Sequence, residues 1–173
     1  MPIVILIVVA AFVALFALFG LAVPKSLYYR NQRPTHLGKL ANRVAGRMGA
    51  VGLGPSWQVR LEVPGRRSGK ITSAPLVVGE YRGDRYLVSM LGPGAEWTKN
   101  ARANGGKVVL NHRGRRPVRL EDVPVAERAP VLKAYLKRAY GARHHFPIGP
   151  DASIEEFAAI ADRYPAFRIV DAG

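Results

Sequence analysis

The sequence predicts an α+β, mainly-β fold: a small β-barrel with peripheral helices, preceded by one N-terminal transmembrane helix. Residues 3–23 form an unbroken apolar run. Residues 57–123 alternate short apolar stretches with tight, glycine-containing turns, and helical patterns are fewer than strand patterns. Because strands outnumber helices and the turns are short, a barrel with helices at its periphery is the most economical architecture.

The apolar run from Ile3 to Val23 carries no charged side chain. At about 1.5 Å per residue, a helix of this length spans about 30 Å, the thickness of a bilayer core. A cleaved secretory signal is the alternative, since Gly20 and Ala22 have a plausible cleavage spacing. No basic segment precedes the run and Pro24 follows it closely, so we interpret residues 1–24 as a transmembrane anchor.

Basic residues follow the run, and no acidic residue occurs before Glu62. The basic residues are Lys25, Arg30, Arg33, Lys39, Arg43 and Arg47. Positive charge on this side predicts a single-pass protein of the cell membrane with its globular domain in the cytoplasm. Residues 35–51 have an amphipathic helical pattern, which either lies on anionic lipid or packs on the domain. Residues 25–56 are therefore a basic juxtamembrane helix and linker, and residues 57–173 are the globular domain.

The globular domain begins with a strand in which Trp57, Val59, Leu61 and Val63 alternate with polar residues. The predicted strands are residues 57–63, 74–79, 86–90, 107–111, 118–123 and 166–170, and the predicted helices are residues 97–103, 125–140 and 154–161. Glycine turns join the strands at residues 82–84 and 113–116, so we expect antiparallel hairpins.

The chain has no cysteine and a formal net charge of +14. The lack of cysteine excludes disulfides, thiolate metal sites, iron–sulfur clusters and a cysteine nucleophile. The positive charge predicts an anionic partner. Nucleic acid is not the partner we expect, because the aromatic residues fall on apolar positions such as Trp57 rather than among the basic ones. The sequence leaves the oligomeric state open.

Histidines and acidic pairs do not form a metal or acid–base pattern. His144 and His145 are adjacent, so their side chains diverge, and no third ligand stands at a metal-site spacing. We therefore predict no metal site. Neighbouring acids such as Glu121 and Asp122 also diverge, which argues against a carboxylate pair for general acid–base catalysis.

Residues 65–70 read Gly-Arg-Arg-Ser-Gly-Lys and connect two predicted strands. Glycines let a backbone approach an anion, a serine offers a hydroxyl, and three cations supply charge. The segment is not a Walker loop, because its glycines are one residue too close and a strand follows it. It is either a phosphate-binding loop or a solvated hairpin turn.

Two further segments accompany this loop: residues 89–94, Ser-Met-Leu-Gly-Pro-Gly, and residues 97–104, Trp-Thr-Lys-Asn-Ala-Arg-Ala-Asn. Together with the loop, the pair Pro75-Leu76 and the closing residues 164–168, they resemble the deazaflavin-dependent nitroreductase family. Members of that family are oxidoreductases with an FMN-binding-like split β-barrel that bind coenzyme F420. The resemblance covers residues 57–170.

The resemblance implies a binding site for coenzyme F420, with FMN as the less favoured cofactor. It assigns Arg66, Arg67, Ser68, Gly69 and Lys70 to the phosphate and acidic tail, Thr72, Ala74 and Pro75 to the tail and ribityl chain, Ser89, Met90, Leu91 and Gly92 to the deazaflavin ring, and Trp97 and Asn100 to the wall of the same pocket.

The resemblance also implies hydride transfer from reduced coenzyme F420 to an electron-poor acceptor such as a quinone, an enone, an unsaturated lipid or a nitro compound. Residues 154–159 lack the tyrosines that line the substrate side in nitroimidazole-reducing relatives, which favours a small lipophilic substrate. Tyr135, Tyr140 and His145 are candidate proton donors, with solvent as the alternative. The alternative function is a non-catalytic, membrane-tethered module that binds coenzyme or nucleic acid by charge.

Overall fold

A computed structural model describes residues 29–30, 33–34 and 56–172. The chain divides into two compact units, Met1–Ala41 and Asn42–Gly173. In the first unit, β1 (Tyr29–Arg30) pairs antiparallel with β2 (Arg33–Pro34). The predicted anchor, residues 1–24, and the predicted amphipathic helix, residues 35–51, lie outside the described residues. Within the described ranges, no helix combines the length and the apolar character that a membrane span requires.

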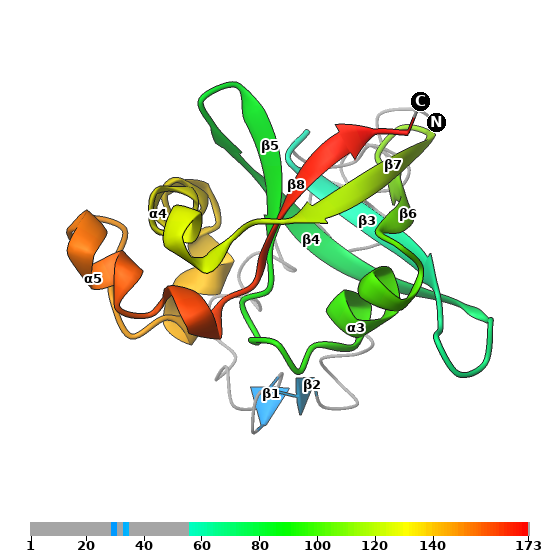
Figure 1. Ribbon diagram of the computed structural model, residues 1–173, viewed down its shortest axis with the longest axis horizontal. Helices are drawn as coiled ribbons and strands as arrows, with labels where there is room; N and C mark the ends of the chain where they lie inside the picture. Colours follow the sequence, from blue (N-terminus) through cyan, green and yellow to red (C-terminus); the bar gives the residue numbers. More distant parts are fainter. Residues whose placement is uncertain (1–28, 31–32, 35–55, 173) are drawn as a thin grey trace, which may run out of the picture. The chain divides into compact units, whose positions relative to one another are not determined.

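The second unit contains a closed barrel with the strand order β3-β4-β5-β8-β7-β6, which confirms the predicted architecture (Figure 1). Its strands are β3 (Gln58–Pro64), β4 (Ile71–Tyr81), β5 (Asp84–Val88), β6 (Lys107–Asn111), β7 (Arg115–Asp122) and β8 (Ala166–Asp171). Every neighbouring pair is antiparallel. The pairing of β3 with β6 closes the barrel, so its strands have no free edge.

The hairpin turns follow the glycine signals in the sequence. Arg82 and Gly83 alone connect β4 to β5, with φ angles of 52° and 86°. Positive φ at both central positions is the hallmark of a type I′ turn, whose twist matches that of the strands beside it. Residues 112–114 connect β6 to β7, again with positive φ at Arg113 and Gly114. Both predicted hairpins are therefore confirmed.

All strands of the barrel contribute to one hydrophobic cluster. The alternation predicted for β3 is confirmed, since Val59, Leu61 and Val63 are buried and their neighbours are less so. The other buried members are Val78, Leu87, Val108, Leu110, Val118, Leu120, Phe167 and Ile169. The helix α3 (Glu96–Ala103) adds buried Ala101 and partly buried Trp97 to this cluster, so α3 is held against the barrel.

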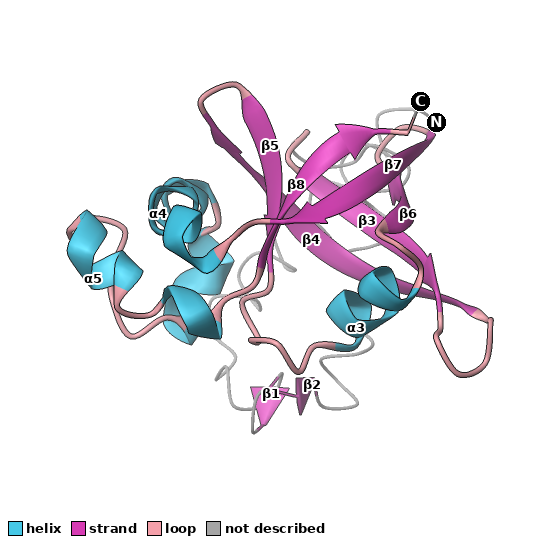
Figure 2. Cartoon of the chain, in the orientation of Figure 1, coloured by secondary structure: helices cyan, strands magenta, loops and turns pink. Residues whose placement is uncertain are grey.

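A helical layer lies on one side of the barrel (Figure 2), and a second hydrophobic cluster contains residues of both. The layer consists of η2 (Val125–Glu127), α4 (Arg128–Arg138), η3 (Tyr140–His145), α5 (Ile154–Ala158) and η4 (Ala161–Arg163). Tyr86 and Val88 of β5 belong to this cluster, whereas Leu87 between them belongs to the barrel cluster. This strand therefore contributes to both clusters, as the period of two along a strand requires.

Five predicted elements have ends that differ by more than one residue in the structure. The predicted strand 74–79 is the longer β4, which runs from Ile71 to Tyr81, and the predicted strand 118–123 begins earlier, at Arg115 of β7. The predicted helix 125–140 is divided into η2 and α4, and Ala139, with ψ of 66°, ends α4. The predicted helix 154–161 stops after Ala158. It begins at a capping box in which the N–H of Glu156 donates to Ser153 Oγ and the N–H of Ser153 donates to Glu156 Oε2. The predicted strand 86–90 ends at Val88, because a turn begins at Ser89.

Candidate functional site

The basic loop, residues 65–70, connects β3 to β4 and closes on itself. The N–H of Gly65 donates to Lys70 O at 2.8 Å, and the N–H of Gly69 donates to Gly65 O at 2.8 Å. The two glycine N–H groups are thus used within the loop and are not free for an anion. The N–H groups of Arg67 and Ser68 have no hydrogen-bond partner among the described residues, so they are the loop donors available to a ligand.

A hydrogen-bonded network fastens this loop to helix α3 through Asn100, which is only 4% exposed. Asn100 Oδ1 accepts from the backbone N–H of Arg66 at 3.2 Å and from Arg66 Nη1 at 2.9 Å. On its other side, Asn100 Nδ2 donates to Thr72 Oγ1, which in turn donates to Val63 O. The network therefore joins Arg66, Thr72 and Asn100, three residues assigned to the coenzyme by the resemblance.

Arg66 also forms an ion pair, because its Nη1 lies 2.6 Å from Glu96 Oε2. This bond, followed by the charges of Arg66, Lys99 and Arg67, holds the pKa of the Glu96 carboxyl below its ordinary value. Glu96 was not among the predicted site residues. The available signal was its spacing from Asn100, since residues four apart on a helix share one face.

The remaining polar residues of the loop are open to solvent. Arg67, Ser68 and Lys70 are all exposed. Among the described residues, no carboxylate forms an ion pair with Arg67 or Lys70. The loop thus offers one guanidinium and one ammonium group without an ion-pair partner, one hydroxyl and two free N–H groups. This set of donors suits a phosphate or a carboxylate.

The residues assigned to the deazaflavin ring form a turn after β5. Ser89 is 1% exposed, and its hydroxyl donates to Gly92 O at 2.6 Å. Its N–H donates to the carbonyl of Pro165, the residue before β8, so a hydrogen bond joins the turn to this part of the chain. Gly92 has φ of 77°, which favours glycine. Met90 packs against the helical-layer cluster, and Leu91 is half-buried beside it in the turn.

Trp97 lies on α3 three residues before Asn100, and it packs against the hydrophobic cluster of the barrel. The ring centroids of Trp97 and Phe167 are 5.3 Å apart at 59°. On β4, half-buried Ala74 and Pro75 pair with Leu61 and Arg60 of β3. Neither cavity described below is lined by Trp97, Ala74 or Pro75, so their place in a pocket wall stays a prediction.

The three candidate proton donors belong to the helical layer. Tyr135 is 3% exposed and packs on Gly79, and burial raises the pKa of its phenol. Ile71, the residue after the basic loop, and Gly79 are eight residues apart along β4, which corresponds to about 26 Å. Tyr140 is exposed, and the carbonyl of His145 accepts a hydrogen bond from Tyr164 Oη at 2.7 Å. Tyr135 is therefore a packing residue far from the basic loop.

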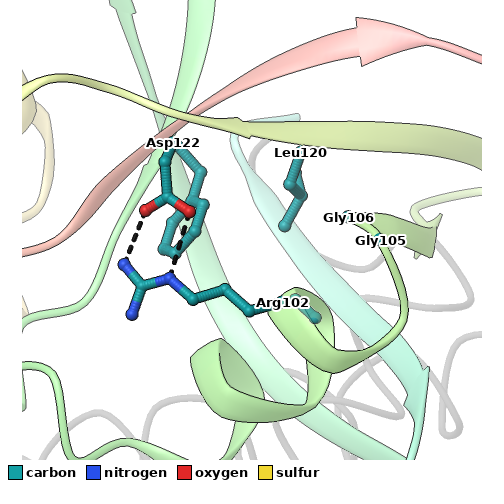
Figure 3. A pocket seen from close by; sticks show the side chains of 7 residues that line it. Arg102, Gly105, Gly106, Leu120 and Asp122 are labelled. Atoms are coloured by element: carbon teal, nitrogen blue, oxygen red, sulfur yellow. Dashed lines mark hydrogen bonds and ion pairs between the residues drawn. The ribbon is translucent and has the colours of Figure 1, made fainter.

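A cavity of about 180 Å³ lies behind the C-terminal end of α3 (Figure 3). Arg102 and Asp122 form a two-point ion pair at its wall, with Arg102 Nε 3.0 Å from Asp122 Oδ2. A Cβ atom at Gly106 would lie 2.3 Å from Leu120 O, so this position requires glycine. The cavity is smaller than ordinary ligand pockets of about 300–1,000 Å³ and contains no predicted coenzyme residue.

A larger cavity of about 490 Å³ begins beside the basic loop. Pro64 and Ile71, the two residues that flank the loop, line one end of it. The remaining lining residues come mainly from β6 and β7, including Lys107, Val109 and Pro117. The register places Val109 beside both Glu62 and Pro117, so this cavity lies across three neighbouring strands.

No family model and no curated protein matches the sequence. Similar solved structures include Atu2129 from Agrobacterium tumefaciens, a protein of unknown function. It is 13% identical over 87% of this chain and 57% of its own, with a TM-score of 0.51. An F420-H2 dependent reductase, FDR-A, is 20% identical over 66% of this chain and 94% of its own, with a TM-score of 0.44. A NimC/NimA family protein from Clostridium acetobutylicum is 16% identical over 84% and 86%, with a TM-score of 0.44.

At these identities the similarity concerns the fold. The closed six-stranded barrel agrees with the β-barrel that the resemblance to the deazaflavin-dependent nitroreductase family implies. The roles of the individual site residues remain predictions, which the experiments below address.

Proposed function

We propose that this chain is an F420-dependent oxidoreductase that transfers a hydride from the reduced coenzyme to a small, lipophilic, electron-poor acceptor. The observation that carries the proposal is the exposed donor set of Arg67, Ser68 and Lys70. These residues lie in the loop that Arg66 joins to Asn100 of α3. Its chemistry fits the phosphate and carboxylates of the coenzyme better than the single phosphate of FMN, because more than one cation is left without a partner among the described residues.

In this proposal the chain binds and orients, and the coenzyme supplies the hydride from its C5 carbon. Arg67 and Lys70 hold the anionic tail at the loop. The Asn100 network keeps the loop at a fixed distance from α3, and the turn at residues 89–92 supports the ring end. Because Tyr135 is buried and the pKa of its phenol is raised, we propose solvent as the source of the accompanying proton.

The decisive experiment uses the full chain, purified in detergent and supplied with reduced coenzyme F420. We expect the coenzyme to be oxidised faster with a lipophilic quinone than with a polar nitroaromatic compound. Absorbance of the purified protein provides an independent readout, since a bound deazaflavin absorbs in the near-visible range and copurified nucleic acid absorbs only in the ultraviolet. Tight coenzyme binding without reduction of either acceptor would favour the non-catalytic module.

We also propose that residues 1–24 anchor the enzyme in the cell membrane, where lipophilic acceptors concentrate. The absence of charge in residues 3–23 supports this proposal. Deleting residues 1–24 is expected to move the protein from the membrane pellet to the supernatant at high salt. Replacing Ala11 with arginine should cost about 2.5–3.5 kcal/mol of insertion free energy and reduce the membrane fraction. Equal pelleting of the intact and truncated chains would contradict the anchor.

A further inference from the structure

The carboxylate of Glu96 lies where three positive side chains converge. Its Oε2 is 2.6 Å from Arg66 Nη1, and its Oε1 is 3.8 Å from Lys99 Nζ. Arg67 also acts on it electrostatically, and together these cations lower the pKa of the Glu96 carboxyl. The Glu96 side chain is nevertheless 72% exposed. A solvent-exposed carboxylate therefore lies among three cations beside the basic loop.

Arg66 does not depend on Glu96 for its position. Its backbone N–H and its Nη1 both donate to Asn100 Oδ1, and Asn100 is buried and further bonded to Thr72. The Nε and Nη2 groups of Arg66 have no hydrogen-bond partner within the described part of the chain. If the Glu96 carboxylate swung away, Arg66 would keep its anchor on α3 and present its guanidinium to another anion.

We propose that the Glu96 carboxylate occupies the binding position of the ligand's anionic group, and that Lys99 is a further binding residue at this position. The inference rests on the proposed function and adds two residues to its site. The shared chemistry of the ligand group is a phosphate or a carboxylate. A dianionic phosphate is favoured over a single carboxylate, because a monoanion only replaces the charge that Glu96 already supplies.

Glu96 thus acts as an internal competitor that lowers the affinity for every external anion. Its side chain is free to rotate into solvent when the ligand binds, since it is mostly exposed and lies at the first residue of α3. The competing explanation is that Glu96 only stabilises the N-terminus of α3 through the helix dipole. If that were its only role, Glu96→Gln would change anion binding no more than removal of an acid at another helix N-terminus.

The chain offers a matched control in Glu155, an acidic residue in the first turn of α5. Its carboxyl pKa is lowered by hydrogen bonds from its own backbone and from Ser153 and by the charge of Lys133, and no arginine contributes. Glu155→Gln changes the net charge and a helix N-terminus in the same way as Glu96→Gln. Lys137, exposed near the end of α4, is the corresponding control for Lys99.

The experiment titrates the full chain in detergent with coenzyme F420, followed by fluorescence, and separately with inorganic pyrophosphate, followed by calorimetry. We expect Glu96→Gln to bind both probes about three- to tenfold more tightly, and Lys99→Ala to bind them about three- to tenfold more weakly. Glu155→Gln and Lys137→Ala should stay within about twofold of the wild type. Thermal unfolding of each variant establishes that it is folded.

The outcomes separate this inference from the proposed function. Coenzyme binding that is unaffected by Glu96→Gln and Lys99→Ala would overturn the inference and leave the proposed function standing. If Glu96→Gln tightens pyrophosphate binding but coenzyme F420 does not bind at all, the anion-binding position at Glu96 is supported and the proposed function is excluded. Equal effects of Glu96→Gln and Glu155→Gln, or binding of neither probe, would overturn the inference.

Discussion

Replacing Arg67 with alanine is expected to weaken coenzyme F420 binding about ten- to a hundredfold. Arg67 is exposed in the basic loop and has no carboxylate partner among the described residues, so its guanidinium is available to the coenzyme's phosphate. A charge-assisted contact of this kind is worth about 1.5–3 kcal/mol. The loss should appear in a fluorescence titration, and binding by the variant should depend less on salt.

The matched control is Arg113→Ala, which removes one exposed arginine from the turn between β6 and β7. It should leave the affinity within about twofold, because only a distant charge is lost. Lys70→Ala should weaken binding less than Arg67→Ala, since an ammonium group on a flexible stem makes no two-point contact. Unchanged affinity in both loop variants would exclude the basic loop from the coenzyme site.

The barrel could be predicted because its signals are local. Alternation in Val59, Leu61 and Val63 marks an inward face, and Gly83 and Gly114 mark the tight turns that make consecutive strands antiparallel. The helix ends were harder to predict. Ala139 ends α4 through its own backbone conformation, and the six-residue η3 that follows has no hydrophobic period by which a sequence reveals it.

The composition of the basic loop could be read from the sequence, but the use of each group could not. The contacts of Arg66 with Glu96 and Asn100 join residues 30 and 34 positions apart, and they depend on where α3 packs against the barrel. Similarly, the loop glycines were expected to free their N–H groups, whereas Gly65 and Gly69 use them to close the loop. Local patterns do not specify which donors such a closure consumes.

Arg67 and Lys70 differ from Arg66 in this respect. They belong to the same sequence motif, yet within the described residues their side chains form no ion pair and no hydrogen bond to Asn100. The motif therefore contains two kinds of cation: Arg66, which positions the loop, and Arg67 and Lys70, which remain available. We therefore expect Arg66→Ala to affect mainly the stability of the loop, and Arg67→Ala and Lys70→Ala to affect mainly ligand binding.

Replacing Phe167 with alanine is expected to reduce the free energy of unfolding by about 3–5 kcal/mol, the usual cost of removing a large buried aromatic side chain. Phe167 is 1% exposed at the start of β8, and its neighbours in register are Leu87 of β5 and Asp122 of β7. The loss should be visible as an earlier midpoint in urea unfolding with little change in slope.

The same substitution should disturb the candidate site, because the Trp97 ring rests on Phe167 and the Arg102 guanidinium lies 5.1 Å from the Phe167 ring centroid. Without that support, Trp97 becomes more exposed and its fluorescence should shift to longer wavelength. Phe167→Leu keeps most of the volume and should cost only about 1–1.5 kcal/mol, with a smaller shift. A loss below about 1 kcal/mol in Phe167→Ala would contradict the packing of α3 on the barrel, since a cavity of that size beneath Trp97 cannot form without cost.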